Sequence, residues 1–255
     1  MANYLTSFDT YAEYSAATLN LPNVSLIKST GKVYYKNIFA GATLGDILMW
    51  DNVNSKLVTT IGGNWDSTTY PIAQYEPIAI NVYPSSQASD GKSRYMALKW
   101  ASNASASGST NNVNLKWGPD STTAGDITST DQTALNGREN TDKVVEIMPS
   151  TSGNTQAEYP AFYAVNIFHT NGTNAGDWYL PSKAELSLYN DNYSDINSKI
   201  EAIKNASSSI VNTVNIYQWV STEGTSSVTW LLLTNGSFGN LNRSDSYAVR
   251  GMIAL

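Results

Sequence analysis

The segment from Gly176 to Leu255 constrains the fold more than any other part of the chain. It begins GDWYLPSKAEL, in which the apolar residues Trp178–Leu180 predict a short strand that Pro181 ends. Ser182 and Glu185 have the spacing of a capping box, in which each side chain accepts a hydrogen bond from the backbone N–H of the other residue. The segment therefore predicts a strand that passes directly into a helix.

The segment continues with two predicted strands, QWVSTE and VTWLLL, whose tryptophans are Trp219 and Trp230. We expect both tryptophans and Leu232 in the core, because strand side chains alternate between two faces. The same alternation places Thr229, Leu231 and Leu233 on the outer face. Apolar side chains that stand among Asn and Ser on an outer face indicate a surface selected for contact with a partner.

These motifs and the closing VRGMIAL together resemble the C-type-lectin-fold domains of the formylglycine-generating-enzyme type. More narrowly, they resemble the variable proteins of diversity-generating retroelements in gut Bacteroidetes and their phages. The resemblance extends from about Pro77 to Leu255, and it departs from the family pattern at Val220, where Ser is common, and at Gly251, where Pro is common. It implies a ligand-binding domain whose surface at about residues 217–250 is diversified.

The resemblance assigns ligand binding to residues that were expected to face outward or to lie in turns. Retroelement variation acts at adenines, so codons such as those for Asn change into codons for Ser, Tyr, Asp, Leu, Phe and Val, which is the mixture in this segment. The predicted ligand-binding residues are Gln218, Val220, Gly224, Thr225, Ser226, Ser227, Thr229, Leu231, Leu233, Phe238, Asn240, Leu241, Asn242, Ser244, Asp245 and Tyr247. An ordinary β surface with a few exposed apolar residues is the alternative interpretation.

Composition argues against several other functions. Charged residues make up 14% of the chain and its net charge is −6, which argues against a nucleic-acid-binding surface. The chain has no cysteine, which excludes disulfides, thiolate metal sites and the cysteine chemistry of formylglycine-generating enzymes. His169, the single histidine, lacks the partners of a catalytic triad and is expected to contact a carbonyl at a helix end. We therefore expect binding without catalysis.

No cofactor or metal ion is expected either. Asp120, Asp126 and Asp131 do not have the spacing of an EF-hand, and we expect them to be solvated loop carboxylates. The calcium-dependent sugar-binding tripeptides of animal lectins are also missing from the sequence, so the resemblance by itself does not imply a sugar ligand.

Two small modules are predicted before the main domain. Residues 1–37 predict an αββ module, with a helix over residues 7–18 and two strands joined by a turn at residues 29–32. Residues 38–75 predict a short β-rich connecting module. The fold class expected for the whole chain is α+β: a C-type-lectin-like domain with small N-terminal αβ and β modules.

The main domain is predicted to span residues 76–255. It opens with a strand bounded by Pro77 and Pro84 and a second strand over residues 93–100. A loop-rich insertion follows at about residues 101–156, with one or two helical turns between Thr130 and Asn140. Further on, a helix is predicted over residues 159–170, and the capping box starts a second helix that runs through Ile203.

The resemblance also implies the partners. We expect a protein or glycan receptor on a bacterial surface, with a homotrimer as one way to raise a weak single-site affinity. The N-terminus lacks the pattern of a signal peptide, and no apolar run approaches the ~18 residues of a membrane helix. We thus expect synthesis in the cytoplasm, no membrane insertion, and display on a virion (phage tail) or a cell surface. The alternatives are a fixed-specificity adhesin or structural tail component of the same fold and, more remotely, an enzyme.

Overall fold

The computed structural model describes residues 6–8, 24–27, 32–35, 41–60, 62, 65–119, 127–148, 158–207 and 217–255. The chain divides into two compact units, Met1–Ala40 and Gly41–Leu255.

The first unit contains a three-stranded sheet. Strand β1 (Thr6–Phe8) pairs in parallel with β2 (Val24–Ile27), which pairs antiparallel with β3 (Lys32–Tyr35). The two strands predicted around residues 29–32 are therefore confirmed. The helix predicted from Ser7 is wrong at its start, because pairing with β2 holds Ser7 and Phe8 extended in β1; the rest of that helix lies outside the described residues.

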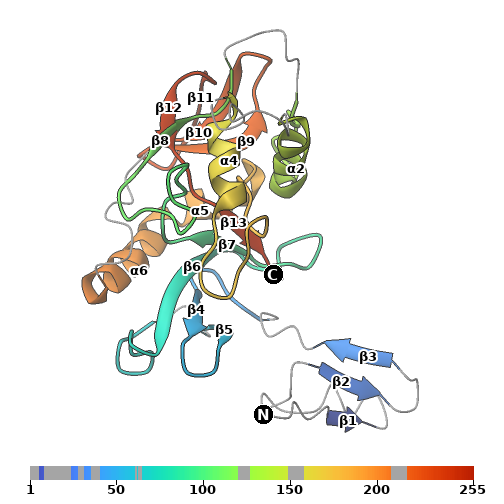
Figure 1. The fold of residues 1–255 in the computed structure, drawn as a ribbon, viewed down its shortest axis with the longest axis vertical. Helices are drawn as coiled ribbons and strands as arrows, with labels where there is room; N and C mark the ends of the chain where they lie inside the picture. Colours follow the sequence, from blue (N-terminus) through green and yellow to red (C-terminus); the bar gives the residue numbers. More distant parts are fainter. Residues whose placement is uncertain are drawn as a thin grey trace. The chain divides into compact units, whose positions relative to one another are not determined.

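The second unit begins with a sheet of strand order β13-β7-β6-β4-β5, here the β6 sheet (Figure 1). Its members are β4 (Ile47–Asp51), β5 (Lys56–Thr59), β6 (Tyr75–Tyr83), β7 (Arg94–Ala97) and β13 (Met252–Ala254), and all neighbours are antiparallel. The strands predicted over 77–84 and 93–100 correspond to β6 and β7. Because β4 pairs with β6 and its apolar side chains are buried, residues 41–75 lie in the same compact unit as residues 76–255.

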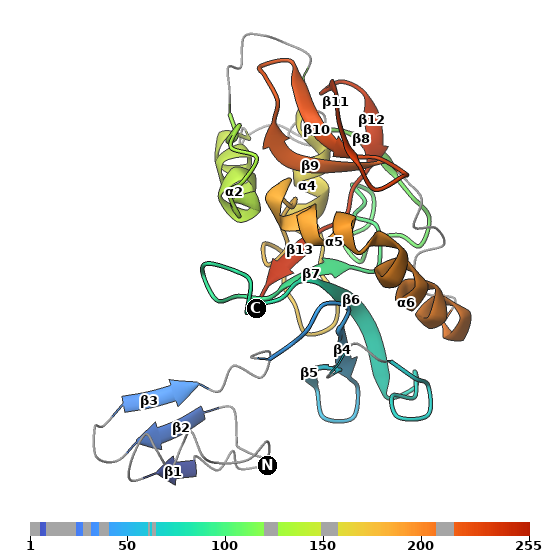
Figure 2. The same cartoon turned by 180° about the vertical axis from the view of Figure 1, so that it is seen from behind.

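A second sheet, here the β10 sheet, has the order β11-β10-β9-β12-β8. Its strands are β8 (Asn114–Lys116), β9 (Gln218–Glu223), β10 (Val228–Leu232), β11 (Phe238–Asn242) and β12 (Ser246–Ala248). The β9–β12 pair is parallel and the other pairs are antiparallel. Figures 1 and 2 show this sheet at one end of the second unit and β4–β6 at the other.

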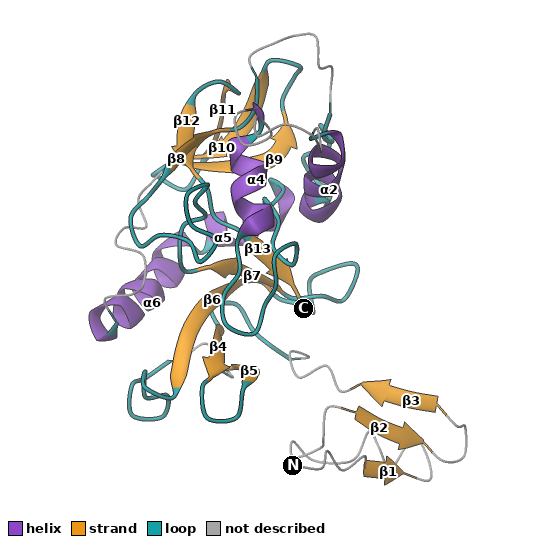
Figure 3. Cartoon of the chain, in the orientation of Figure 1, coloured by secondary structure: helices purple, strands orange, loops and turns teal. Residues whose placement is uncertain are grey.

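Helices pack against both sheets (Figure 3). In the β10 sheet, α2 (Gly137–Ile147) packs against β9 and α4 (Pro160–Ile167) packs against β8. In the β6 sheet, η2 (Ala184–Leu186), α5 (Ser187–Asp191) and α6 (Tyr193–Ala206) pack against β6. None of the described helices is of a length and apolarity that would let it cross a membrane.

The predicted helices are largely confirmed, with shifted bounds. The helix expected over residues 159–170 is α4, which ends at Ile167. The turns expected between Thr130 and Asn140 are displaced to α2 at residues 137–147. The helix expected after the capping box is interrupted at Asn192, where the backbone leaves the helical region between α5 and α6.

Two apolar clusters result from this arrangement, one on each side of the β10 sheet. The cluster toward the β6 sheet includes Ile80, Met96, Ile196, Ile200, Val220 and Leu232. The cluster toward α2 and α4 includes Trp117, Val144, Phe162, Val165, Trp219 and Leu231. The β10 sheet is therefore covered on both faces over much of its area.

The predicted capping box is present and has a second role. The Ser182 N–H donates to Glu185 Oε2 at 2.8 Å, and the Glu185 N–H donates to Ser182 Oγ at 3.3 Å. The other carboxylate oxygen of Glu185 accepts from Tyr179 Oη at 2.9 Å and from Arg94 Nε at 3.2 Å. Arg94 also binds Asp90 through two hydrogen bonds of 2.6 and 2.8 Å. The buried carboxylate of Glu185 thus links the capping box, Arg94 on β7 and Tyr179.

Glu185→Gln is expected to lower the free energy of unfolding by about 3–5 kcal/mol, because it leaves the buried Arg94 without one of its two carboxylates. Glu201→Gln is the matched control: its ion pair with Lys204 is on the solvent side of α6, and its loss is expected to change stability by about 0.5 kcal/mol or less. Urea unfolding of both variants measures the difference. Equal effects would contradict a supporting role for the Glu185 carboxylate.

Candidate ligand-binding surface

The β10–β11 hairpin presents two faces, which its register defines. Trp230 pairs with Asn240 and Leu232 with Phe238, whereas Thr229 pairs with Leu241 and Leu231 with Gly239. Because alternate residues point to opposite sides, each strand contributes to both faces. One side, here the Trp230 face, carries Val228, Trp230, Leu232, Phe238, Asn240 and Asn242. The other, here the Leu231 face, carries Thr229, Leu231, Gly239 and Leu241.

The Leu231 face is core. Thr229 and Leu231 are both 0% exposed, and Leu231 belongs to the cluster with Trp219 beside α4. The outward assignment of Thr229 and Leu231 is therefore wrong. Trp230, expected in the core, packs against the cluster toward the β6 sheet but is only partly buried. Large apolar side chains stand on both faces of β10, so alternation alone does not tell which face is covered more deeply.

Two predicted binding residues on β9 are also buried. Gln218 is 2% exposed and Val220 is 0% exposed, since β9 is the central strand of its sheet. Val220 packs with Leu232 and Ala248 in the cluster toward the β6 sheet. The outward placement of these two residues is therefore wrong as well.

The remaining predicted residues fall into three places. Leu233, Leu241 and Tyr247 are partly buried and pack at the margin of the α4-side cluster. The β9–β10 turn holds Gly224, Thr225, Ser226 and Ser227, while Ser244 and Asp245 lie in the turn before β12. Phe238, Asn240 and Asn242 lie on the Trp230 face. The structure thus does not gather all the predicted residues on one surface.

The exposed part of the Trp230 face is the end that approaches the β9–β10 turn. Asn240, Asn242 and Thr225 are exposed there. A Cβ on Gly224 would lie 3.0 Å from Asn240 Oδ1 and 3.2 Å from Val228 Cγ2, so the turn closes over the end of this face. A side chain at residue 224 would displace both neighbours. Of the predicted binding residues, Thr225, Asn240 and Asn242 are those that the structure leaves exposed.

Lys183 packs against the aromatic part of the Trp230 face, and no local sequence pattern indicates this position. Its ammonium lies 3.3 Å from the centroid of the Trp230 ring and 5.4 Å from that of Phe238. It also donates to Gln132 Oε1 at 2.6 Å. Burial lowers the pKa of Lys183, because the ammonium loses hydration. Cation–π contacts of this kind contribute about 0.5–2 kcal/mol.

The backbone under this surface is held by a buried ion pair. Glu223 and Arg243 are both 0% exposed and are joined by a contact of 2.9 Å between Oε2 and Nη2. The same Nη2 donates to the Thr225 carbonyl at 2.8 Å, and Glu223 Oε1 accepts from the N–H groups of Ile127 and Thr128. Charged hydrogen bonds therefore fix the β9–β10 turn on its buried side, and small uncharged side chains stand on its solvent side.

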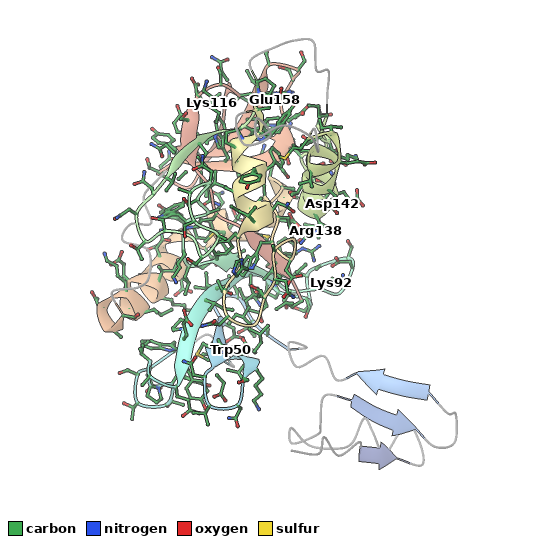
Figure 4. The ribbon with its side chains drawn as sticks, viewed as in Figure 1. Trp50, Lys92, Lys116, Arg138, Asp142 and Glu158 are labelled. Atoms are coloured by element: carbon green, nitrogen blue, oxygen red, sulfur yellow. The ribbon has the colours of Figure 1, made fainter. Side chains whose placement is uncertain are left out.

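A pocket of about 310 Å³ lies beside Arg138 near the end of β13. Figure 4 labels Arg138. The Arg138 guanidinium donates to the carbonyls of Gly176 and Asp177 and forms an ion pair with Asp142 at 3.5 Å. Because these hydrogen bonds hold the loop before Trp178, Arg138 has a structural role in this pocket.

Other predicted residues fit no chemical site. The Nδ1 of His169 lies 3.1 Å from the Ile167 carbonyl just after α4, which agrees with a helix-end role. Asp131 is exposed and accepts hydrogen bonds from Thr133, whereas Asp120 and Asp126 lie outside the described residues. Within the described part of the chain, no group of three or more His, Asp or Glu residues is placed to hold a metal ion.

Comparison with known proteins informs the fold only. No family model matches the chain, and no curated protein matches it. Among solved structures, a fimbrial protein from Bacteroides ovatus ATCC 8483 is similar, with a TM-score of 0.54 and 14% identity over 84% of this chain and 49% of that one. The chain thus spans about half the length of that protein. Both share an α+β fold, and at this identity the likeness concerns fold alone.

Leu231→Ala is expected to cost about 2–5 kcal/mol of stability, because it opens a cavity between β10 and α4. Leu241→Ala is the matched control on the neighbouring strand, where a partly buried leucine is expected to contribute about 1 kcal/mol. Thermal and urea unfolding compare the two variants. Similar losses would show that the inner and outer positions of this hairpin are assigned incorrectly.

Proposed function

We propose that this chain is a surface-recognition protein of the adhesin type, which binds a protein or glycan receptor on a bacterial surface without catalysis. One observation carries the proposal: the Trp230 face combines partly exposed aromatic rings with exposed amide side chains, beside a turn that the buried Glu223–Arg243 pair fixes. Rigid aromatic anchors surrounded by adaptable polar groups are typical of recognition surfaces. The fold likeness to a fimbrial protein supports the same role.

We further propose the finer assignment that the sequence resemblance implies. In it, residues 76–255 form a C-type-lectin-like domain, the surface around residues 217–250 is diversified by a retroelement, and the protein is displayed on a virion or a cell surface, with a homotrimer as one form. Burial restricts this proposal. Replacement at Thr229 or Leu231 disturbs the core, so diversification that preserves folding is confined to the turns and the exposed end of the Trp230 face.

The genome sequence tests diversification directly. We expect a near-copy of the segment that encodes residues 217–250 next to a reverse-transcriptase gene, with differences at adenines. The differences are expected to fall mainly on Thr225–Ser227, Asn240, Asn242, Ser244 and Asp245. A near-copy whose differences concentrate on codons for buried residues would contradict the surface assignment, and a genome without any near-copy would contradict diversification.

The fimbrial likeness favours one alternative, a fixed-specificity adhesin or a structural subunit of the same fold. In that case the same surface binds one receptor or one neighbouring subunit, and the genome contains no template copy. The cell-binding experiment therefore tests recognition, and the genome search tests diversification.

The triple variant Thr225→Ala, Asn240→Ala, Asn242→Ala is expected to keep its thermal midpoint and to weaken binding to cells of a Bacteroides host by more than about tenfold, equivalent to about 1.4 kcal/mol. The double variant Asn111→Ala, Asn112→Ala is the control, because these exposed residues precede β8 at the opposite edge of the sheet. Flow cytometry with labelled protein measures binding. Unchanged binding by a folded triple variant would refute this recognition surface.

A further inference from the structure

Lys183 is a cation without a carboxylate partner among the described residues. Its contacts there are the Trp230 and Phe238 rings and the neutral Gln132 amide. The chain carries an excess of acidic residues. Among the residues whose burial the structure describes, the other partly buried lysines, Lys99, Lys199 and Lys204, each have a carboxylate within 4.0 Å. A partly buried charge that lacks an opposite charge is costly unless something compensates it. Lys183 is therefore a candidate for contact with an anion from outside the chain.

The position of Lys183 is built into the fold. Its backbone N–H donates to Thr222 Oγ1 on β9 at 2.9 Å, and the preceding Pro181 accepts from the Ser221 N–H at 2.7 Å. The capping box of Ser182 and Glu185 holds the other side. Only the side chain of Lys183 is free to adjust, so a ligand that binds its ammonium meets a preorganised backbone.

The hydrogen-bond donors of this cluster exceed its acceptors. An ammonium has three N–H groups; in Lys183 one donates to Gln132 and one faces the Trp230 ring, which leaves a third. A carboxylate is an acceptor-only group, so it complements both the charge and the remaining N–H of the Lys183 ammonium.

The surroundings of the ammonium determine what carries that carboxylate. Phe238 and Trp230 are partly exposed apolar rings, and Asn240 is an exposed amide that pairs with Trp230 across the strands. A sugar ring has one apolar C–H face and a rim of hydroxyls, which suit an aromatic ring and uncharged amides respectively. No described contact supplies the second cation or the guanidinium fork that a phosphate group favours.

We propose that Lys183, Trp230 and Phe238 form a subsite for an acidic sugar residue, whose carboxylate binds the Lys183 ammonium and whose ring lies against the exposed aromatic edges. The proposal rests on the proposed recognition function and narrows its receptor to a glycan that contains uronic or sialic acid. The lowered pKa of Lys183 agrees with it, because an anionic ligand restores the stabilisation that the ammonium lost on burial.

The test uses the full chain and three acidic probes: trigalacturonate, a hyaluronan tetrasaccharide and sialyllactose. Galactotriose, chitotetraose and lactose are the neutral counterparts. We expect calorimetry or ligand-observed NMR to detect at least one acidic probe and to show binding at least about tenfold tighter than to its neutral counterpart, with affinity that falls as salt is raised. Binding of no acidic probe, or equal binding of the neutral sugars, overturns the proposal.

Substitutions of Lys183 test the contribution of its charge to binding separately from its contribution to the fold. Lys183→Gln is expected to weaken binding of the acidic sugar by about tenfold or more, and Lys183→Arg is expected to restore much of it. Lys116→Gln is the matched control, because Lys116 is an exposed lysine on β8 at the far edge of the same sheet (Figure 4). If Lys183→Gln folds and binds the acidic probe as the wild type does, Lys183 only covers Trp230 and the proposal is wrong.

Cell binding distinguishes this inference from the function on which it rests. Cell binding that survives Lys183→Gln but is lost in the Thr225, Asn240 and Asn242 triple variant overturns the acidic-sugar subsite and leaves the recognition surface in place. Cell binding that survives both sets of substitutions overturns both proposals.

Discussion

The buried carboxylate of Glu185 is the interaction on which the second unit depends. It caps the chain at Ser182, accepts from Tyr179 and pairs with Arg94 on β7. The backbone of Tyr179 exchanges two hydrogen bonds with Met252 on β13, so the same carboxylate ties the start of the helical segment to the β6 sheet. Gly137 at the start of α2 lies so close to Glu185 that a Cβ there would clash with its carboxylate.

The candidate binding surface follows from this cap by a short chain of contacts. With Ser182 fixed, Lys183 is held against β9 by the hydrogen bond that its backbone N–H donates to Thr222 Oγ1. The side chain of Lys183 then extends over the Trp230 ring on β10. Lys183, which the sequence places at the start of a helix, therefore contributes to a surface formed by strands near the end of the chain. The same backbone therefore supports the fold and the proposed recognition surface, while different side chains serve the two roles.

Sequence predicted those features that depend on near neighbours, and it failed where a distant element decides. The capping box, the strands β6 and β7, and α4 follow from local periodicity and local hydrogen bonding. The faces of β10 do not, because Trp230 and Leu231 are both large and apolar, and only the packing of α4 shows that Leu231 is the deeper one. The place of Lys183 over Trp230 likewise depends on residues far apart in sequence.

The buried Glu223–Arg243 pair shows how this surface tolerates change. Arg243 follows β11 directly and binds both Glu223 and the Thr225 carbonyl, so it fixes the turn through backbone and buried atoms. The side chains of Thr225 and Asn242 point to solvent and contribute little to that support. Substitutions in these exposed positions are therefore expected to affect the proposed recognition more than the fold. A charge change at Glu223 or Arg243 leaves its partner buried and unpaired, and removes the support on which any change in the surface depends.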